Sequence, residues 1–349
     1  MKSLIITAFS ESGNPMMDRF RHRNLQECIS RCQQVFPSAD QCVAVQGASP
    51  WFDSVEFRGK RINLESPGSF RKPLLLNAAV RENPGYDMYM MVDADVYLAK
   101  ELVEYAVANC TTGRLVYPYG DTVYMDEMDT RSMCADGKLL PGTKDHGVTI
   151  RRQTGLCMAF TGSDFEAVAG FDEAFSGWGA EDDAFMFKFR RKGFEVLRNP
   201  DKGAVAYHMF HPIVSTPEYK SGDEYMHNRI CCACIRRMSD DDFADYLAGK
   251  AGMDSLVGKY RALGRLEVEL NWDCSPDAML NIDTTIYDID RSGKMTMKKV
   301  LEAVLAEDGP EGILEFAEGV LYRIPGLPAE MKKEIDSYCD DARATLHKG

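Results

Sequence analysis

Short apolar runs alternate with segments of helical periodicity through about the first 210 residues. The runs SLIITAF, QCVAVQG and YDMYMMVDADVYL have strand length, and an amphipathic stretch from Asp18 to Phe36 separates the first two. Farther along, GLCMAF, FEVLRN and GAVAYHM predict strands, while TGSDFEAVAGF and EDDAFMFKFRRKG predict helices. Such alternation predicts an α/β fold, in which a sheet carries helices on both faces.

Two parts of the chain depart from this alternation. The segment PYGDTVYMDEMDTRSMCADGKLLPGTKDHG, residues 118–147, is polar and weakly periodic, so we expect a long loop of the kind that often acts as a lid. From about Ser221 onward the pattern is predominantly helical. We therefore expect a first domain over residues 1–220 and a mostly helical C-terminal region over residues 221–349.

Composition narrows the protein class. The 349 residues are 45% hydrophobic, which is enough for a sizeable core. No apolar run reaches the roughly 18 residues of a membrane span, and Met1 precedes a strand-like segment instead of a signal sequence, so neither export nor a membrane span is expected. The 11 scattered cysteines predict reduced thiols in a cytoplasmic protein. A net charge of -13 argues against a general surface for polyanions.

Carboxylates and histidines follow the ends of predicted strands. Asp93 and Asp95 are two residues apart, so on an extended backbone both side chains face the same way and can reach one cation. Oxygen ligands suit Mg²⁺ or Mn²⁺, and an imidazole from His208 or His211 favours Mn²⁺. Such acids also cap loops, and such histidines also lie in cores. The prediction of a metal site therefore depends on their conjunction.

The stretch GWGAEDD places Trp178 between two glycines, followed by three acids. Acids at the start of a helix interact favourably with its dipole, but this needs only one of them. A tight turn that presents an indole face can stack a sugar ring. A neighbouring carboxylate can then act as the general base for a hydroxyl.

These segments resemble a known enzyme family. FDEAFSGWGAEDDAFMFKFRRKGFEV and GAVAYHM resemble the C-terminal signature of GT-A fold glycosyltransferases, specifically the β-1,4-galactosyltransferases and the bacterial chondroitin polymerase type. Upstream, FRHRNLQECI, SFRKPLLLN and VDADV resemble the family's uridine, diphosphate and DxD elements in the same order. The resemblance covers roughly residues 1–215 and implies a nucleotide-sugar transferase fold, with a Rossmann-like mixed sheet flanked by helices. It departs from the family at Ala180, where the pattern has glycine.

The resemblance also implies a role for each matching residue. Asp182 matches the catalytic base, and Glu181 matches a residue that holds sugar hydroxyls. Contacts to the donor and its nucleotide are implied for Arg21, Arg23, Lys72, Asp93, Trp178 and Gly179. Metal ligation is implied for Asp95, His208 and Asp93, with His211 as the alternative histidine. The implied reaction is metal-dependent transfer, with Mn²⁺ or Mg²⁺, of a hexose or N-acetylhexosamine from a UDP-sugar to a hydroxyl, with inversion.

Other functions are compatible with the same residues. One alternative is a nucleotide-sugar-binding or glycan-binding protein without catalysis, although such a protein has no need of a base. Another is a nucleotidyltransferase, although this function leaves Trp178 unexplained. A glycan is the expected acceptor, with modified nucleic acid or protein as alternatives, and the oligomeric state is not indicated. DIDRSGKMTMKK, Asp288 to Lys299, resembles the start of an EF-hand loop. Because Lys299 replaces the bidentate glutamate, a polar turn before a helix is the better interpretation.

Overall fold

The computed structural model describes residues 1–151, 153–201, 203–212, 223–263, 266, 297–319, 321 and 329–346. The chain forms two compact units. The first comprises Met1–Val214 and Ala244–Lys250, and the second comprises Ser215–Phe243 and Ala251–Gly349. A domain boundary at residue 220 stays a prediction. The EF-hand-like segment falls mostly on residues 288–296, which lie outside the described residues.

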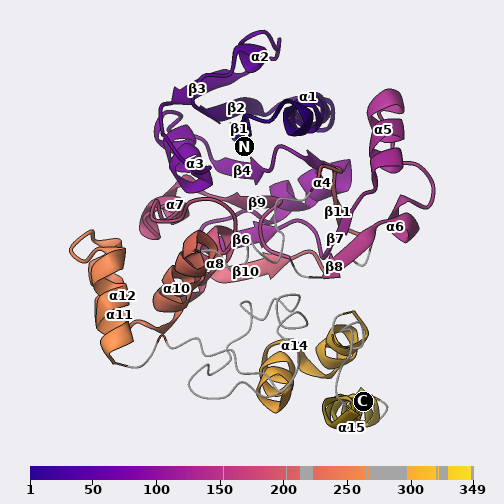
Figure 1. Ribbon diagram of the computed structural model, residues 1–349, viewed down its shortest axis with the longest axis vertical. Helices are drawn as coiled ribbons and strands as arrows, with labels where there is room; N and C mark the ends of the chain where they lie inside the picture. The colour runs from indigo at the N-terminus through magenta and orange to yellow at the C-terminus, as the bar shows by residue number, and fades with distance from the viewer. Residues whose placement is uncertain are drawn as a thin grey trace. The chain divides into compact units, whose positions relative to one another are not determined.

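A mixed sheet forms the centre of the first unit, with strand order β10-β6-β9-β4-β1-β2-β3 (Figure 1). The strands are β1 (Ser3–Ser10), β2 (Asp40–Gln46), β3 (Lys60–Leu64), β4 (Met88–Val92), β6 (Arg114–Tyr117), β9 (Cys157–Phe160) and β10 (Glu195–Arg198). β1 pairs in parallel with β2 and β4, whereas β9 is antiparallel to β4 and β6. The predicted mixed α/β sheet is thus confirmed.

Helices cover both faces of this sheet, as predicted. They are α1 (Pro15–Val35), α2 (Pro50–Asp53), α3 (Lys72–Arg81), α4 (Lys100–Asn109), α7 (Gly162–Ala167) and α8 (Glu181–Arg191). In Figure 1, α1 and α3 lie on opposite faces of β1 and β2. α1 begins before the expected Asp18, because the Asn14 side chain caps it by accepting hydrogen bonds from the amides of Met16 and Met17.

A second, smaller sheet has the order β5-β11-β7-β8. Its strands are β5 (Val96–Tyr97), β7 (Asp121–Tyr124), β8 (Val148–Arg151) and β11 (Val205–His208). β11 is antiparallel to β5, with His208 opposite Val96. In addition, the Met209 amide donates to the Asp95 carbonyl at 2.7 Å. This pairing brings residues 208–211 beside the end of β4, although more than a hundred positions separate them in the sequence.

The prediction of a long loop over residues 118–147 is wrong. This segment contains β7, α5 (Glu127–Asp136) and α6 (Thr143–His146). The Asp126 carboxylate caps α5 by accepting from the Asp129 amide, and Gly137 ends the helix in a left-handed conformation. The buried face of α5 includes Asp129 and Thr130, so no apolar periodicity marks it in the sequence.

Aromatic packing fixes α8 against the main sheet. Phe185 stacks on Phe171 with ring centroids 3.9 Å apart and meets Phe160 of β9 edge-on at 5.4 Å. The buried Lys188 ammonium donates to the Gly170 carbonyl at 2.6 Å, and burial lowers its pKa to about 8. These contacts hold the start of α8, and therefore its acids, in a fixed position relative to β9.

The C-terminal region is helical in its described parts, as predicted. Its helices are α10 (Asp223–Arg237), α11 (Asp240–Leu247), α12 (Met253–Ala262), α14 (Met297–Gly319) and α15 (Ala329–Leu346). A buried cluster that includes Leu301, Val304 and Ile335 joins α14 to α15. Among the described helices, none is both long enough and apolar enough to cross a membrane.

Phe185→Ala is expected to lower the free energy of unfolding of the first unit by about 3–5 kcal/mol, because it leaves a cavity among buried rings. Urea denaturation would measure the change. Val107→Ala is the control, since that apolar side chain of α4 is 38% exposed. Equal losses in the two variants would contradict the role given to the Phe185 packing.

Candidate active site

The acids after β4 lie in a turn and have different partners. All five residues of β4 are buried, and the chain turns immediately after Val92. The Asp93 carboxylate accepts from the Leu156 amide at 3.2 Å, and the Val96 amide donates to the Asp93 carbonyl at 3.2 Å. The backbone is therefore not extended here, and the expectation that Asp93 and Asp95 reach one cation stays a prediction.

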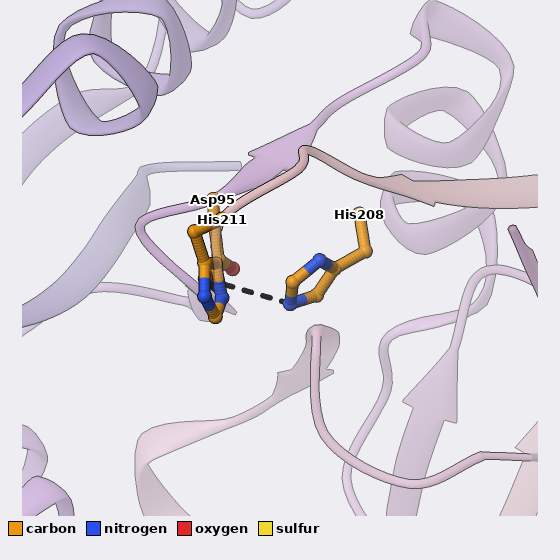
Figure 2. A group of neighbouring side chains, drawn as sticks. All are labelled: Asp95, His208 and His211. Carbon is orange, nitrogen blue, oxygen red and sulfur yellow. Dashed lines mark ion pairs between the residues drawn. The ribbon is translucent and has the colours of Figure 1, made fainter. Parts of the chain in front are cut away.

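Asp95 lies with both histidines that follow β11 (Figure 2). Its Oδ2 atom is 3.5 Å from Nε2 of His208 and 3.1 Å from Nε2 of His211. One potential ligand atom from each of the three residues lies within 4.8 Å of the others. The sequence offered the two histidines as alternatives, whereas the structure brings both to the same carboxylate. Metal ligation by Asp93, which lies outside this group, stays a prediction.

The group fits a divalent cation. Nδ1 of His211 lies 3.0 Å from the Pro212 carbonyl, which can only accept, so this nitrogen carries a proton. In neutral His211 the Nε2 lone pair therefore faces the Asp95 carboxylate, and two facing acceptors require a proton or a cation between them. One carboxylate and two imidazoles are ligands that suit Mn²⁺ and similar metals.

The electrostatic environment agrees with this pairing. Burial opposes the charge of Asp95, but the neighbouring histidines hold the pKa of its carboxyl well below the usual range. Burial lowers the pKa of His208. For His211 burial acts in the same direction, but the hydrogen bond and charge of Asp95 outweigh it and raise the pKa. His211 is therefore the member of the group whose proton competes most with a metal near neutral pH.

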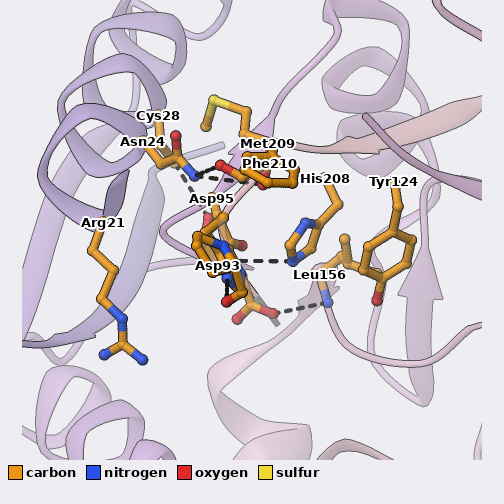
Figure 3. Close-up of polar contacts among 12 residues, drawn as sticks. Arg21, Asn24, Cys28, Asp93, Asp95, Tyr124, Leu156, His208, Met209 and Phe210 are labelled. Atoms are coloured by element: carbon orange, nitrogen blue, oxygen red, sulfur yellow. Dashed lines mark hydrogen bonds and ion pairs between the residues drawn. The ribbon is translucent and has the colours of Figure 1, made fainter. Parts of the chain in front are cut away.

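Residues that the sequence did not single out support the histidines. The Tyr124 ring stacks on His208 with centroids 4.4 Å apart, and Gln153 donates to the Tyr124 hydroxyl at 2.6 Å. Asn24 donates to the Phe210 carbonyl at 3.2 Å (Figure 3). Tyr124 lies in the segment expected to be a loop, and Asn24 directly follows FRHR, so neither position carried a signal of its own.

The two arginines of FRHR contact backbone carbonyls. Arg23 donates to the Phe210 carbonyl at 2.9 Å, so it helps to hold the segment that carries the histidines. Arg21 extends from α1 (Figure 3) and donates to the Ser10 carbonyl at 2.9 Å, at the end of β1. Contact of either arginine with a nucleotide stays a prediction.

A second cluster of charges surrounds the buried Lys72. Its ammonium is 2.9 Å from Asp93, 2.9 Å from Asp182 and 3.5 Å from Glu181. Burial raises the pKa of Asp182 well above its ordinary value; Lys72 counteracts this shift, and Glu181 and Asp93 add to it. The structure thus brings together Lys72, Asp93, Glu181 and Asp182, which the sequence placed in three separate motifs.

The three acids that follow the turn before α8 have different partners. Gly177, Gly179 and Ala180 all have positive φ, and the Trp178 side chain is 46% exposed. Glu181 accepts from the Gly179 amide at 3.1 Å. The hydroxyl of Thr154 donates to Asp183, while Asp182 pairs with Lys72. Each acid therefore has a partner of its own, and capping of the helix is not their common purpose.

We expect the affinity for Mn²⁺ to fall as the pH decreases from about 8 to about 5, because a protonated imidazole has no lone pair for the metal. The loss should begin above the ordinary histidine range, since the pKa of His211 is raised. Calorimetric titration with Mn²⁺ would measure it.

His211→Ala should weaken binding and flatten this pH dependence, whereas His22→Ala should change neither, because His22 pairs with Glu11 away from the group. Equal Mn²⁺ affinity in His211→Ala and the unchanged protein would exclude His211 as a ligand.

Comparison with known proteins adds an independent finding. Residues 146–212 match a family model described as the N-terminal domain of galactosyltransferase. This stretch contains GWGAEDD and both histidines of the Asp95 group.

Several solved structures are similar to the chain. The catalytic domain of Drosophila β1,4-galactosyltransferase 7, in complex with xylobiose, is 16% identical, with 65% of this chain and 79% of that chain covered and a TM-score of 0.39. GalNAc-T7 with UDP, GalNAc and Mn²⁺ is 12% identical, with 75% and 54% covered and a TM-score of 0.47. S. aureus TarS 1–349 is 13% identical, with 100% and 92% covered and a TM-score of 0.42. The match over residues 146–212 confirms the predicted resemblance to the galactosyltransferases in this part of the chain.

Proposed function

We propose that this enzyme transfers a hexose or N-acetylhexosamine from a UDP-sugar to an acceptor hydroxyl, with inversion at the sugar carbon. Asp182 is the general base, and Asp95, His208 and His211 hold a divalent cation, with Mn²⁺ favoured over Mg²⁺. A glycan is the proposed acceptor, as the sequence resemblance implies. The cytoplasmic location stays a prediction.

One observation carries the proposal. Oδ2 of Asp182 is held by Lys72, while Oδ1 is buried and has no hydrogen-bond partner among the described residues. Buried carboxylate oxygens normally accept a hydrogen bond, so this atom is available to a hydroxyl donor. The raised pKa of Asp182 increases its basicity, which suits a carboxylate that must take a proton near neutral pH.

The neighbouring residues supply the other requirements of the reaction. Trp178 presents a half-exposed indole ring in the loop that leads directly into Glu181 and Asp182. An aromatic face of this kind binds the apolar face of a sugar ring. Glu181 would hold sugar hydroxyls, and Gly179 would allow the sugar to approach the backbone closely. A bound metal would act as a Lewis acid for the departing diphosphate.

The acceptor hydroxyl donates its proton to Oδ1 of Asp182 as its oxygen attacks the sugar carbon. The bond from that carbon to the UDP oxygen breaks on the opposite face, and UDP leaves with the bonding electrons. Positive charge develops on the ring during the exchange, as it does in glycoside hydrolysis. The buried position of Asp182 limits competition from water for the same carbon.

Release of UDP from a panel of UDP-sugars, with Mn²⁺ and with EDTA, tests the function. Slow, metal-dependent release from one sugar is the expected result. Asp182→Asn should then lower turnover about 10²–10⁴-fold and leave UDP binding unchanged, because only the base is removed. Unchanged turnover would remove Asp182 from this role. UDP binding without release, or release of diphosphate from a nucleotide, would favour the binding protein or the nucleotidyltransferase.

Gly155→Ala is expected to lower turnover about 10²-fold by displacing the base. Gly155 has a φ of +90°, and an added Cβ atom would lie within 2.3 Å of Oδ2 of Asp182. Gly113→Ala is a matched control, because Gly113 has a φ of +87° and no atom within 4 Å of the added Cβ. Both variants carry the strain of a Cβ atom at positive φ, and only Gly155→Ala adds the contact with Asp182. Equal turnover in the two variants would contradict the tight placement of Asp182.

A further inference from the structure

We infer that Lys72 is a positioning residue that holds the Asp182 base in place, and not a ligand of the donor diphosphate. This inference rests on the proposed function, and it assigns Lys72 a role other than the one implied by sequence resemblance. It follows from the contacts of the ammonium, from its burial, and from the way in which the backbone on either side of Lys72 is fixed.

Carboxylates enclose the Lys72 ammonium. A lysine ammonium has three N–H groups, and three carboxylates surround that of Lys72. Two of these contacts, to Asp93 and Asp182, are 2.9 Å long, and the third, to Glu181, is 3.5 Å long. The Lys72 side chain is only 8% exposed. A phosphate oxygen that approached the ammonium would therefore compete with these carboxylates for it.

The location of Lys72 in its helix points to the same role. Lys72 is the first residue of α3, where the helix dipole disfavours a positive charge, and the first turn of α3 contains no acid. The carboxylates of Asp93 and Asp182 come from the ends of other elements and offset this cost. The charge of Lys72 is therefore stabilised by these two carboxylates, and the charges of the carboxylates are stabilised by Lys72.

The backbone on either side of Lys72 is tied to the loop before α8. The Gly177 amide donates to the Phe70 carbonyl at 2.8 Å, and the Arg71 side chain donates to the Glu173 carbonyl at 2.6 Å. The start of α3 and the start of α8 are thus held together by backbone contacts as well as by the ion pair. Lys72 consequently reaches Asp182 from a fixed position and can orient its carboxylate.

The orientation of Asp182 has a direct consequence for its second oxygen. Lys72 takes Oδ2, and Gly155 lies so close to the same atom that an added Cβ atom would clash with it. With Oδ2 confined in this way, Oδ1 is the oxygen left without a partner. Lys72 therefore determines which oxygen of the base faces the acceptor.

Kinetic constants and UDP affinity of Lys72 variants separate the two roles. Lys72→Met should lower kcat about 10²-fold or more, while the Kd for UDP in the presence of Mn²⁺ changes by less than about threefold. Lys72→Arg should recover at least about tenfold of the lost kcat, because it restores the charge. A tenfold or greater rise of the UDP Kd with little change in kcat would overturn the inference in favour of a diphosphate contact.

The double variant Lys72→Met/Asp182→Asn should be no slower than Asp182→Asn alone, because Lys72 acts through Asp182. It also removes one cation together with one anion, so it provides a measurement if Lys72→Met alone does not fold. Multiplication of the two single losses would overturn the inference.

Hydrogen–deuterium exchange gives a readout that does not depend on turnover. Lys72→Met should speed exchange at least about threefold in peptides covering residues 177–186, where backbone protection depends on local opening. Lys192→Met is the control, since it removes an exposed lysine next to the end of the same helix. Unchanged exchange in Lys72→Met would overturn the positioning role. Absence of turnover in the unmodified enzyme would instead refute the proposed function, and the exchange result would still decide the role of Lys72.

Discussion

Negative charge gathered at one edge of the main sheet is the constraint on which the site depends. Asp93, Asp95, Glu181 and Asp182 lie there within two adjoining clusters, and buried carboxylates are stable only when each has a counter-charge or a donor. The chain meets this requirement in two different ways. Lys72 is a permanent counter-charge for one cluster, whereas Asp95 relies on two histidines and, in the proposed enzyme, on a cation.

The two clusters are joined by a short piece of backbone. Asp93 and Asp95 flank the turn after β4, and each carboxylate belongs to a different cluster. The turn is fixed on one side by the Leu156 backbone and on the other by the Met209 amide. A shift of this turn would therefore move the base cluster and the proposed metal ligands together. The separation of the two aspartates lets one cluster orient a base while the other holds a cation.

The charged clusters are not what makes the fold stable. Buried ion pairs recover little more than the cost of removing their charges from water. Stability of the region comes instead from apolar packing, such as the stack of Phe185 on Phe171 behind the first turn of α8. The apolar side of α8 anchors the helix, and its first residues carry the acids. Because the apolar side of α8 supplies the stability, its first residues can carry charges that add little to folding.

The sequence by itself determined the alternation of strands and helices and the helical C-terminal region, because periodicity is a local property. It also indicated DAD, GWGAEDD and the histidines as candidate site residues, because the ends of strands can be recognised locally. It failed where the determining contacts were distant. The helix at residues 127–136 has a partly polar buried face, so no apolar pattern marked it. The extended backbone expected at Asp93 and Asp95 is absent, because the strand ends at Val92 and the chain turns. Only the tertiary structure decided that both histidines share Asp95 and that Lys72 is enclosed by carboxylates, since these contacts depend on the pairing of β11 with β5 and on the docking of α8 beside α3.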